Sequence, residues 1–465
     1  MGDIIVLSLF VIVYAMAYFF TKKDGIQAFV ILVLASQFLP SYLKFGPIQY
    51  QTLFSYISFL FCVVYFVKNK TDRSARGLLN LFIVYLSVLL LWAILSNTLF
   101  NERQFSYLKT ALRNFSLYMF VFAYIRKKNN SINVYRFFSG FLLMLTIYGL
   151  YCYFTQTNVI VSFFNMWYNP DDTALAAHML QERGGLRGRI QGMSSITLEY
   201  AGQLLVSFFM MMHYVLNVKK KITPYYIILF VLMFVNLFFT GCRSALIGFV
   251  IGIFAWIYLF GGLSFKIKKR ITLTFICAYF VLVFYSSVMA DFGDYIRSII
   301  FFWEQSDTIE GSSFEMRMTQ LEAAIGMIDN NPMTMLFGLG ADWVRQYSMS
   351  HGGLHPVLLG FESVVFIGLI EFGVIGLFVV TYGFYFLLYR FARKCHASKI
   401  VVVIIFAFVV FQTFTGNYSQ QFFVCFLLVM IKECSFEYNL SKSQIARNNG
   451  RKFCDKQIIG NIHAK

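Results

Sequence analysis

Apolar stretches long enough to cross a lipid bilayer alternate with polar breaks along most of the chain. A membrane-spanning helix needs about 20 apolar residues, and shorter stretches fit helices that are broken or only partly inserted. The pattern predicts thirteen spans, of which the second, the third and the last are short. The predicted spans are Ile4–Phe20, Gly25–Leu39, Leu53–Val67, Leu78–Leu99, Leu108–Ile125, Phe137–Phe154, Ile196–Val218, Tyr225–Thr240, Ala245–Phe260, Ile271–Ala290, Val364–Tyr389, Ile400–Phe414 and Gln421–Ile431.

Two polar segments are much longer than the other breaks, and both fall on the same side of the predicted spans. Long loops held by a rigid scaffold are candidates for a functional site. The predicted organisation is a set of spans at 1–154, a first large outer loop at 155–195, spans at 196–290, a second large outer loop at 291–363, spans at 364–431 and a basic cytoplasmic tail at 432–465.

The composition agrees with this pattern and excludes a water-soluble enzyme fold. Hydrophobic residues make up 58% of the chain and charged residues only 13%, whereas a soluble globular domain has about 25% charged residues. The expected fold class is therefore an all-α, polytopic integral membrane protein with about 12–13 transmembrane helices.

The net charge of +17 at first indicates an acidic partner such as a nucleic acid. Most of the 39 Lys and Arg residues, however, cluster at every second break, which is the distribution that orients membrane proteins with their basic loops in the cytoplasm. We therefore expect the N-terminus outside, the basic tail inside and no nucleic-acid partner. The basic clusters are Lys22–Lys23, Lys68–Arg76, Arg126–Arg136, Lys219–Lys221, Lys266–Arg270, Arg390–Lys399 and the tail from Lys432.

The second outer loop contains a helix signal. Ser312 and Glu315 have the spacing of a capping box, and apolar residues follow at helical spacing until Pro332 approaches. The helix is expected to be amphipathic and to lie on the membrane or across the outer mouth of the bundle, with Arg317 on its polar face. Its predicted apolar positions are Met318, Leu321, Ile325 and Ile328.

Several arginines lie on the outer side, against the topological bias of the other basic residues. Each could pair with an acid such as Glu199 or Glu371, or reach lipid phosphates. A set of guanidinium groups also suits an anionic substrate, because their planar donors bind phosphate oxygens bidentately and stay charged. The candidate anion-binding residues are Arg113, Arg187, Arg189, Arg243 and Arg317.

Outward candidates for acid–base chemistry precede the eleventh span. His351, His355 and Glu362 could act as a general base that removes a proton from an acceptor hydroxyl. The alternatives are solvated loop histidines and a glutamate that stabilises the start of a helix. Metal-ligand spacings, disulfide spacings and a cytoplasmic phosphate-binding glycine loop are not found in the sequence, so no metal, no cofactor and no ATP-driven transport are expected.

Three strings in order resemble the superfamily of O-antigen ligases and Wzy-type polysaccharide polymerases. They are Thr240-Gly-Cys-Arg-Ser-Ala-Leu-Ile-Gly248, then Arg317 with Phe337-Gly-Leu-Gly340, then Glu362-Ser-Val-Val-Phe-Ile-Gly-Leu-Ile-Glu-Phe-Gly373-Val-Ile-Gly376. The resemblance covers about residues 187–378. It implies a metal-independent membrane glycosyltransferase of the C type (GT-C-like) that uses undecaprenyl-diphosphate-linked glycans on the outer leaflet of the bacterial inner membrane. It also implies that Arg243 and Arg317 hold the diphosphate, with Arg187 and Arg189 as additional contacts.

One departure bears on the activity. At Glu362-Ser363 the chain resembles the ligase branch of this superfamily less well, because that branch typically has a histidine followed by asparagine at these two positions. His351 and His355 come too early in the sequence to match that histidine. We therefore expect a polymerase in O-antigen, capsule or exopolysaccharide synthesis, with Glu362 or His355 as the base. The alternatives are an O-antigen ligase, which transfers polymer to the lipid A core of lipopolysaccharide, and, from another class, a flippase of lipid-linked oligosaccharide. Expected partners are the lipid-linked substrate, membrane lipid, a chain-length regulator and a separate flippase.

Overall fold

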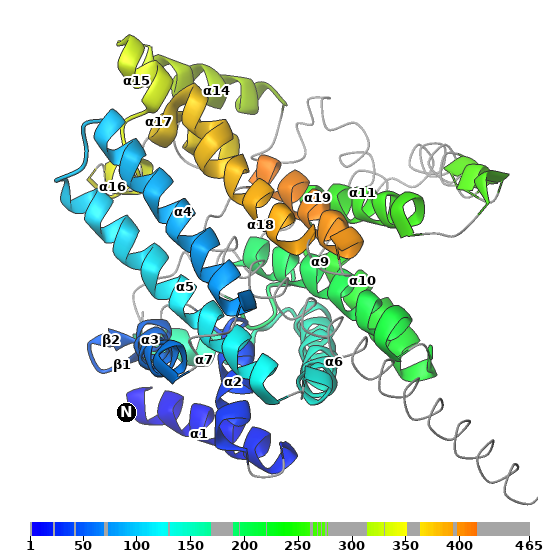
Figure 1. Ribbon diagram of the computed structural model, residues 1–465. Helices are drawn as coiled ribbons and strands as arrows, with labels where there is room; N and C mark the ends of the chain where they lie inside the picture. Colours follow the sequence, from blue (N-terminus) through cyan, green and yellow to red (C-terminus); the bar gives the residue numbers. More distant parts are fainter. Residues whose placement is uncertain are drawn as a thin grey trace, which may run out of the picture.

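The computed structural model describes most of the membrane-embedded part of the chain. The described residues are 2–21, 24–40, 43–68, 73–128, 131–168, 189–194, 196–219, 221–260, 264–266, 268–270, 272–274, 277, 314–329, 331–350, 363–393 and 398–415. Within them the protein is a bundle of helices, and one short hairpin is the only β-structure described (Figure 1).

The first half of the described chain forms one group of helices on the side of the N-terminus. The elements are α1 (Gly2–Phe20), α2 (Gly25–Ser36), β1 (Lys44–Phe45), β2 (Ile48–Gln49), α3 (Tyr50–Lys68), α4 (Arg73–Leu95), α5 (Glu102–Lys128), α6 (Ser131–Thr155) and α7 (Val159–Tyr168). In this group α1 packs on α2, both α3 and α4 pack on α5, and α2 also contacts α6.

The second half adds the helices that carry most of the motifs. A turn of π-helix follows α9 and another follows α17. The elements are α9 (Thr197–His213), η1 (Tyr214–Lys219), α10 (Pro224–Phe239), α11 (Arg243–Phe260), α14 (Phe314–Ile328), α15 (Pro332–Phe337), α16 (Trp343–Ser350), α17 (Val364–Gly376), η2 (Leu377–Tyr382), α18 (Gly383–Arg393) and α19 (Ser398–Thr415).

Most of the predicted spans correspond to helices. Only the predicted spans Ile271–Ala290 and Gln421–Ile431 lie largely or wholly outside the described residues. In the part of the chain that the structure describes, four helical stretches are long and apolar enough to cross a membrane, namely Tyr50–Lys68, Arg76–Leu95, Asn133–Thr155 and Val364–Arg393. Shorter apolar helices accompany them at Val6–Phe20, Gly25–Ser36, Pro224–Phe239, Arg243–Leu259 and Lys399–Thr415. The predicted all-α membrane fold is confirmed.

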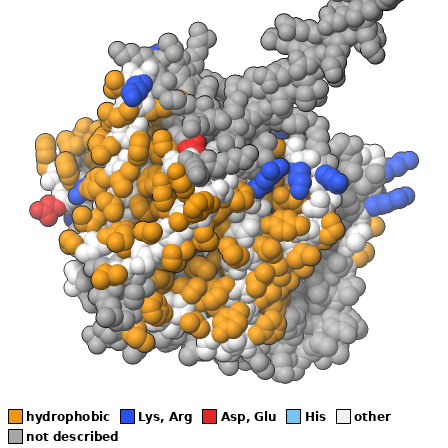
Figure 2. Space-filling view, turned by 90° about the horizontal axis from the view of Figure 1, so that it is seen from below, with side chains coloured by type: hydrophobic (Ala, Val, Ile, Leu, Met, Phe, Trp, Pro, Cys, Tyr) orange, Lys and Arg blue, Asp and Glu red, His pale blue; other side chains and the backbone are white. Residues whose placement is uncertain are grey.

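The outer surface of the bundle is suited to lipid. Figure 2 shows hydrophobic side chains over most of the described part of one face, with Lys and Arg gathered mainly toward one side. A soluble monomer rarely exposes an apolar patch larger than a few hundred Å². The exposed apolar side chains are spread over many helices, including Phe19 of α1, Leu60 of α3, Ile94 of α4 and Ile228 of α10.

Buried polar side chains join the helices inside the bundle. Asn236 of α10 is fully buried, and its Nδ2 donates to the carbonyl oxygens of Thr146 (2.9 Å) and Leu232 (2.8 Å). Its Oδ1 accepts a hydrogen bond from Tyr200 Oη of α9 (3.1 Å). These bonds tie α6, α9 and α10 together where water is excluded and an unsatisfied polar group would be costly.

The predicted span Val364–Tyr389 is not one continuous helix. Gly373 has φ +69° and ψ −176°, a conformation that breaks the helix inside α17. The 30-residue stretch Val364–Arg393 is longer than the roughly 20 residues that a crossing requires. The part after the break is long enough to cross by itself, which leaves the part before it available to build the outer end of the bundle.

Both predicted outer loops contain ordered helices. The first begins with the apolar helix α7, which was not expected, and whose Val161 and Phe164 are buried. In the second, α14 and α15 lie at the edge of the bundle against α17 (Figure 1). The predicted capping residue Ser312 and the side chain of Glu315 lie outside the described residues.

The packed face of α14 differs from the predicted one. Gln320, Ala324 and Ile328 are buried, whereas Met318 and Ile325 are 40% and 46% exposed. The small side chain of Ala324 permits close approach to α17, and this close contact determines which face is buried. The predicted apolar face was therefore wrong in its centre, although the helix does pack across the outer end of α17.

Candidate functional site

The turn between α10 and α11 forms the centre of the candidate site. Helix α10 ends at Phe239 and α11 starts at Arg243, so the chain reverses over Thr240, Gly241 and Cys242. Gly241 adopts φ +65°, in the left-handed region that a side chain disfavours. The short turn places Arg243 on the first residue of an 18-residue helix.

A second arginine, from the first predicted outer loop, lies on this turn. Arg189 Nε donates to the carbonyl oxygen of Thr240 (2.9 Å), and the Ile190 amide donates to that of Phe239 (3.1 Å). A Cβ atom on Gly241 would lie 3.3 Å from Arg189 Nε, so the absent side chain leaves room for the guanidinium. The structure thus brings Arg189 and Arg243 to one turn from two separate parts of the sequence.

Hydrogen bonds from several helices hold the segment that carries Arg189. Asn158, which precedes α7, donates from Nδ2 to the Gly192 carbonyl (2.7 Å). Ser194 Oγ donates to Gln203 Oε1 of α9 (2.9 Å), and Gln203 Nε2 donates to the Gln37 carbonyl beyond α2 (2.9 Å). Arg189 therefore belongs to a hydrogen-bonded part of the predicted outer loop, linked to α2, α7, α9 and α10.

The start of α17 reaches the same region through α19. Ser244 Oγ, in the first turn of α11, lies 2.6 Å from Thr415 Oγ1 at the end of α19. Ser363 Oγ donates to the Thr413 carbonyl and accepts from the Val365 amide (3.1 Å), which caps α17. Ser363, which directly follows Glu362, is therefore held beside α19. Helix α19 is in turn linked to α11, the helix of Arg243, through Thr415 and Ser244.

The charge distribution at the turn favours an anion. The N-terminal end of a long helix carries partial positive charge, and cations near it are unfavourable. Here Arg243 occupies that end and Arg189 lies beside it. Two guanidinium groups together with a positive helix end suit a phosphate ligand, which can accept several charge-assisted hydrogen bonds.

The remaining predicted site residues are placed less completely. Arg317 belongs to α14, but its side chain lies outside the described residues, as does the whole of Arg187. His351, His355 and Glu362 also lie outside them. Arg113 is described, and it contacts α3 rather than the turn between α10 and α11.

Two glycine motifs that the sequence singled out meet backbone to backbone. The amides of Leu339 and Gly340 donate to the carbonyls of Ile370 (2.8 Å) and Glu371 (2.9 Å). Trp92 Nε1 of α4 donates to the Phe372 carbonyl (2.8 Å). The break in α17 frees these carbonyls from the helix, and backbone groups at membrane depth need partners within the protein. The contacts explain why glycine occurs in both motifs.

Glu371 is a buried carboxylate that sequence reasoning considered only as a partner for an arginine. It is 3% exposed, and its Oε1 accepts a hydrogen bond from the Val344 amide (3.4 Å) at the start of α16. Helix α16 leads directly to residue 350, before the segment that contains His351 and His355. The string Glu-Phe-Gly at 371–373 is part of the motif noted in the sequence. The contact of Glu371 with α16, however, depends on the break in the helix at Gly373.

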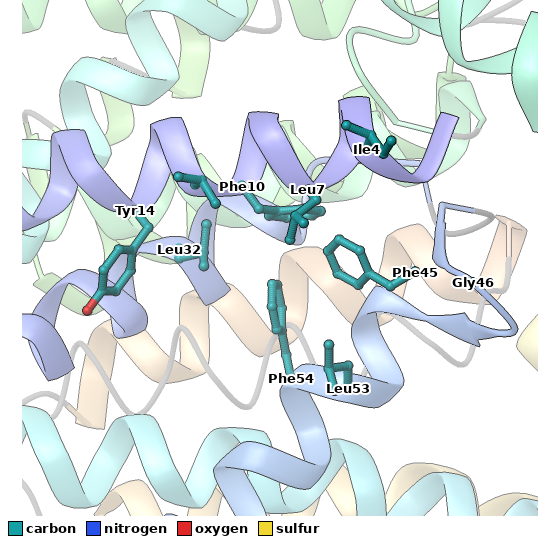
Figure 3. Close-up of a pocket in the computed structure, with 10 residues that line it drawn as sticks. Ile4, Leu7, Phe10, Tyr14, Leu32, Phe45, Gly46, Leu53 and Phe54 are labelled. Carbon is teal, nitrogen blue, oxygen red and sulfur yellow. The ribbon is translucent and has the colours of Figure 1, made fainter. Parts of the chain in front are cut away.

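A separate groove of about 550 Å³ lies between α1, α2, α3 and the hairpin (Figure 3). Phe10, Phe45 and Phe54 point toward one another across it. Its lining is apolar and holds no acid, base or cation, so it suits a hydrocarbon chain and not a reacting group. The lining residues are Ile4, Leu7, Phe10, Val11, Tyr14, Leu32, Phe45, Gly46, Leu53 and Phe54.

Comparison with known families supports the resemblance of the motifs. Residues 228–381 match the family described as O-antigen ligase, a segment that begins within α10, contains the turn of Arg243 and ends within η2. No match is found among curated proteins. Members of this family are membrane enzymes of glycosyltransferase type, which act on lipid-linked oligosaccharide. Residues 228–381 are thus similar to the O-antigen ligase family, which supports the resemblance to the superfamily of O-antigen ligases and Wzy-type polymerases.

Proposed function

We propose that this protein is a polysaccharide polymerase of the bacterial inner membrane. It transfers a growing glycan from undecaprenyl diphosphate to a lipid-linked repeat unit on the outer leaflet. In this reaction an acceptor hydroxyl oxygen attacks the anomeric carbon of the donor, the bond from that carbon to the diphosphate oxygen breaks, and a base takes the hydroxyl proton. The diphosphate departs as the anion.

The observation that carries the proposal is the placement of Arg189 and Arg243 on one turn. Arg189 is held against the Thr240 carbonyl, and Arg243 starts the helix on the other side of Gly241. Negative charge grows on the leaving diphosphate in the transition state, and fixed positive groups at that point lower the barrier without reorganisation. Arg317 and Arg187 are proposed to complete this clamp.

The base is proposed to come from the segment that ends at the start of α17. Ser363 is fixed beside Thr413 of α19, and Glu362 precedes it directly. Glu371 supports the other end of this segment through α16. Glu362 is our first candidate for the base, and His355 and His351 are the others.

An O-antigen ligase is the second candidate, because the matching family carries that description. The two activities share the donor and the leaving group and differ in the acceptor. A ligase transfers the glycan to a lipid A core, whereas a polymerase transfers it to another lipid-linked repeat. The residues Glu362-Ser363, in place of the histidine and asparagine typical of ligases, favour the polymerase.

Purified protein with a synthetic lipid-linked repeat unit tests the proposal. We expect elongation products in detergent, with no second protein present. Arg243→Ala is expected to reduce the rate about 10²- to 10³-fold, the cost of removing one donor to a developing anion. Arg136→Ala, at the cytoplasmic start of α6, serves as the matched control and should keep the rate of the natural protein.

Two results would contradict the proposal. Elongation at the normal rate by Arg243→Ala would show that the turn between α10 and α11 does not stabilise the leaving diphosphate. Transfer to a lipid A core, with no elongation of repeat units under the same conditions, would replace the polymerase by the ligase.

A further inference from the structure

Arg113 occupies an unusual position for a cation in a membrane helix. Its Nη1 donates to Thr52 Oγ1 of α3 (2.8 Å), and its Nε is buried without a hydrogen-bond partner among the described residues. No acidic side chain among the described residues forms an ion pair with it. A guanidinium within a membrane span is costly unless an anion or polar groups surround it. Its surroundings therefore suit a negatively charged ligand.

A second cation lies on the same face of α5. Lys109 is exposed and precedes Arg113 by four residues, so the two side chains are neighbours one turn apart. Thr52 adds a hydroxyl at the same place. The three side chains combine two positive charges and a neutral hydrogen-bonding group, which matches a phosphate better than a single arginine would.

The position of this cluster along the membrane normal fits a lipid headgroup. Thr52 lies in the first turn of α3, whose other end is the inward Lys68. Helix α5 begins at Glu102, about 16 Å along its axis before Arg113 at 1.5 Å per residue. The outer end of α5 thus extends beyond the start of α3. Lys109 and Arg113 lie on α5 near the level at which α3 begins.

This cluster is separate from the turn that carries Arg189 and Arg243. Helix α5 packs against α2, α3 and α4, whereas the turn is held by α9, α10 and α19. Figure 1 shows α3 and α5 on the side of the N-terminus, away from α11 and α19. One phosphate group bound by Arg189 and Arg243 therefore leaves Arg113 available for another.

We propose that Arg113, Lys109 and Thr52 bind the phosphate of a second lipid, the lipid-linked acceptor. The inference rests on the proposed function, because a polymerase must hold two lipid-linked substrates at once. Two diphosphates bound at one clamp would repel each other, because both are negatively charged. Separate cationic sites allow both substrates to be bound at the same time. The acceptor diphosphate is a spectator that anchors its glycan, while the donor diphosphate at Arg243 is the leaving group.

Binding stoichiometry of a short-chain polyprenyl diphosphate tests the inference directly. We expect the natural protein to bind two molecules, and Arg113→Gln and Arg243→Ala to bind one each. Arg136→Gln, at the cytoplasmic start of α6, is the matched control and should still bind two. Two molecules bound by Arg113→Gln would overturn the inference, whereas two bound by Arg243→Ala would instead contradict the proposed clamp.

Competition identifies the source of the phosphate. Phosphatidylglycerol in excess is expected to leave the second polyprenyl diphosphate bound. Complete displacement by phosphatidylglycerol would show that the cluster holds bulk lipid, and would overturn the assignment to the acceptor. The corresponding polyprenol, which lacks phosphate, should not bind there, and equal binding of the alcohol would also overturn it.

Kinetics with donor and acceptor varied separately give a second readout. A lost charge-assisted hydrogen bond corresponds to roughly 10- to 100-fold in binding, so Arg113→Gln should raise the KM for the acceptor by about tenfold or more with kcat largely retained. Lys109→Gln, on an exposed side chain, should shift the KM in the same direction without affecting folding. An unchanged acceptor KM in both variants, or a raised donor KM alone, would overturn the inference.

Discussion

At the scale of single residues, backbone freedom at one glycine contributes to how the arginines are arranged. Arg189 and Arg243 are far apart in sequence, and they meet at the reversal over Gly241, where Arg189 bonds to the Thr240 carbonyl. The guanidinium of Arg189 occupies the space that a side chain at 241 would fill. The arrangement of the two arginines thus depends on Gly241, a residue that has no functional side chain.

Gly241→Ala is expected to impair transfer more than folding. A left-handed conformation costs a non-glycine residue about 1–2 kcal/mol, and the new Cβ would press on Arg189 Nε at 3.3 Å. We expect a loss of activity of about tenfold or more, measured as elongation by purified protein. Gly326→Ala in α14, where a Cβ meets no atom within 4 Å, is the control. Equal activities of the two variants would contradict this role of Gly241.

The buried carboxylate of Glu371 allows a second test at this scale. Its carboxylate accepts a hydrogen bond from the Val344 amide. A Gln side chain keeps an acceptor oxygen for this bond, whereas a Leu side chain does not. Glu371→Gln should therefore retain most activity, and Glu371→Leu should lose most of it. Glu322→Leu, at an exposed position on α14, is the control. If Gln and Leu at position 371 are equally harmful, the hydrogen bond to α16 is not what the residue supplies.

At the scale of elements, the break in α17 organises the outer end of the bundle. The segment at Phe337–Gly340 lies along the broken part of α17, and Trp92 of α4 joins them. The backbone approach is so close that a Cβ on Gly373 would lie 2.4 Å from the Leu336 carbonyl carbon, and one on Gly338 equally close to Glu371. Helices α4, α15, α16 and α17 therefore form one unit.

Gly373→Ala should destabilise this unit strongly. The substitution combines a disfavoured φ with a backbone clash, and we expect a loss of about 2 kcal/mol or more, the range of strained and overpacked sites. Thermal unfolding in detergent measures it, with Gly326→Ala as the reference for a glycine that needs no special conformation. Trp92→Phe, which removes the hydrogen bond to the Phe372 carbonyl and reduces the volume of a buried side chain, should cost about 1 kcal/mol or more. An unfolding temperature of Gly373→Ala equal to that of the reference would show that α17 can re-form without the break.

At the scale of the whole molecule, the alternation of basic clusters predicts the orientation of the helices in the membrane. The described helix ends near the predicted outer loops carry the candidate site, and the helix ends at basic clusters are predicted to face the cytoplasm. The predicted orientation would place both cationic sites, at Arg243 and Arg113, on the side where the lipid-linked glycans are proposed to be joined.

Cysteine labelling of intact cells tests this orientation. In a variant whose eight native cysteines are replaced by Ser, Asn101→Cys between α4 and α5 should react with a membrane-impermeant maleimide. Lys221→Cys between η1 and α10 should react only after the membrane is permeabilised. The reverse pattern, or labelling of both positions in intact cells, would contradict the topology and with it the outward placement of the arginines.

The sequence by itself determined the membrane fold and the approximate positions of most described helices, and it predicts the orientation and the arginine motifs. These properties follow from local composition, because hydrocarbon selects apolar helices of a given length and translocation selects the side of basic residues. The match over residues 228–381 agrees with what the motifs indicated.

Only the tertiary structure decided which motifs meet. It placed Arg189 on the turn of Arg243, separated Arg113 from both, and joined Glu371 to α16. It also showed that α17 is broken at Gly373 and that α14 packs through Ala324 and not through Ile325. Hydropathy cannot supply these facts, because in lipid an apolar side chain gains little by packing on another helix. The arrangement is instead decided by close backbone contacts and by partners for buried polar groups, which come from residues distant in sequence.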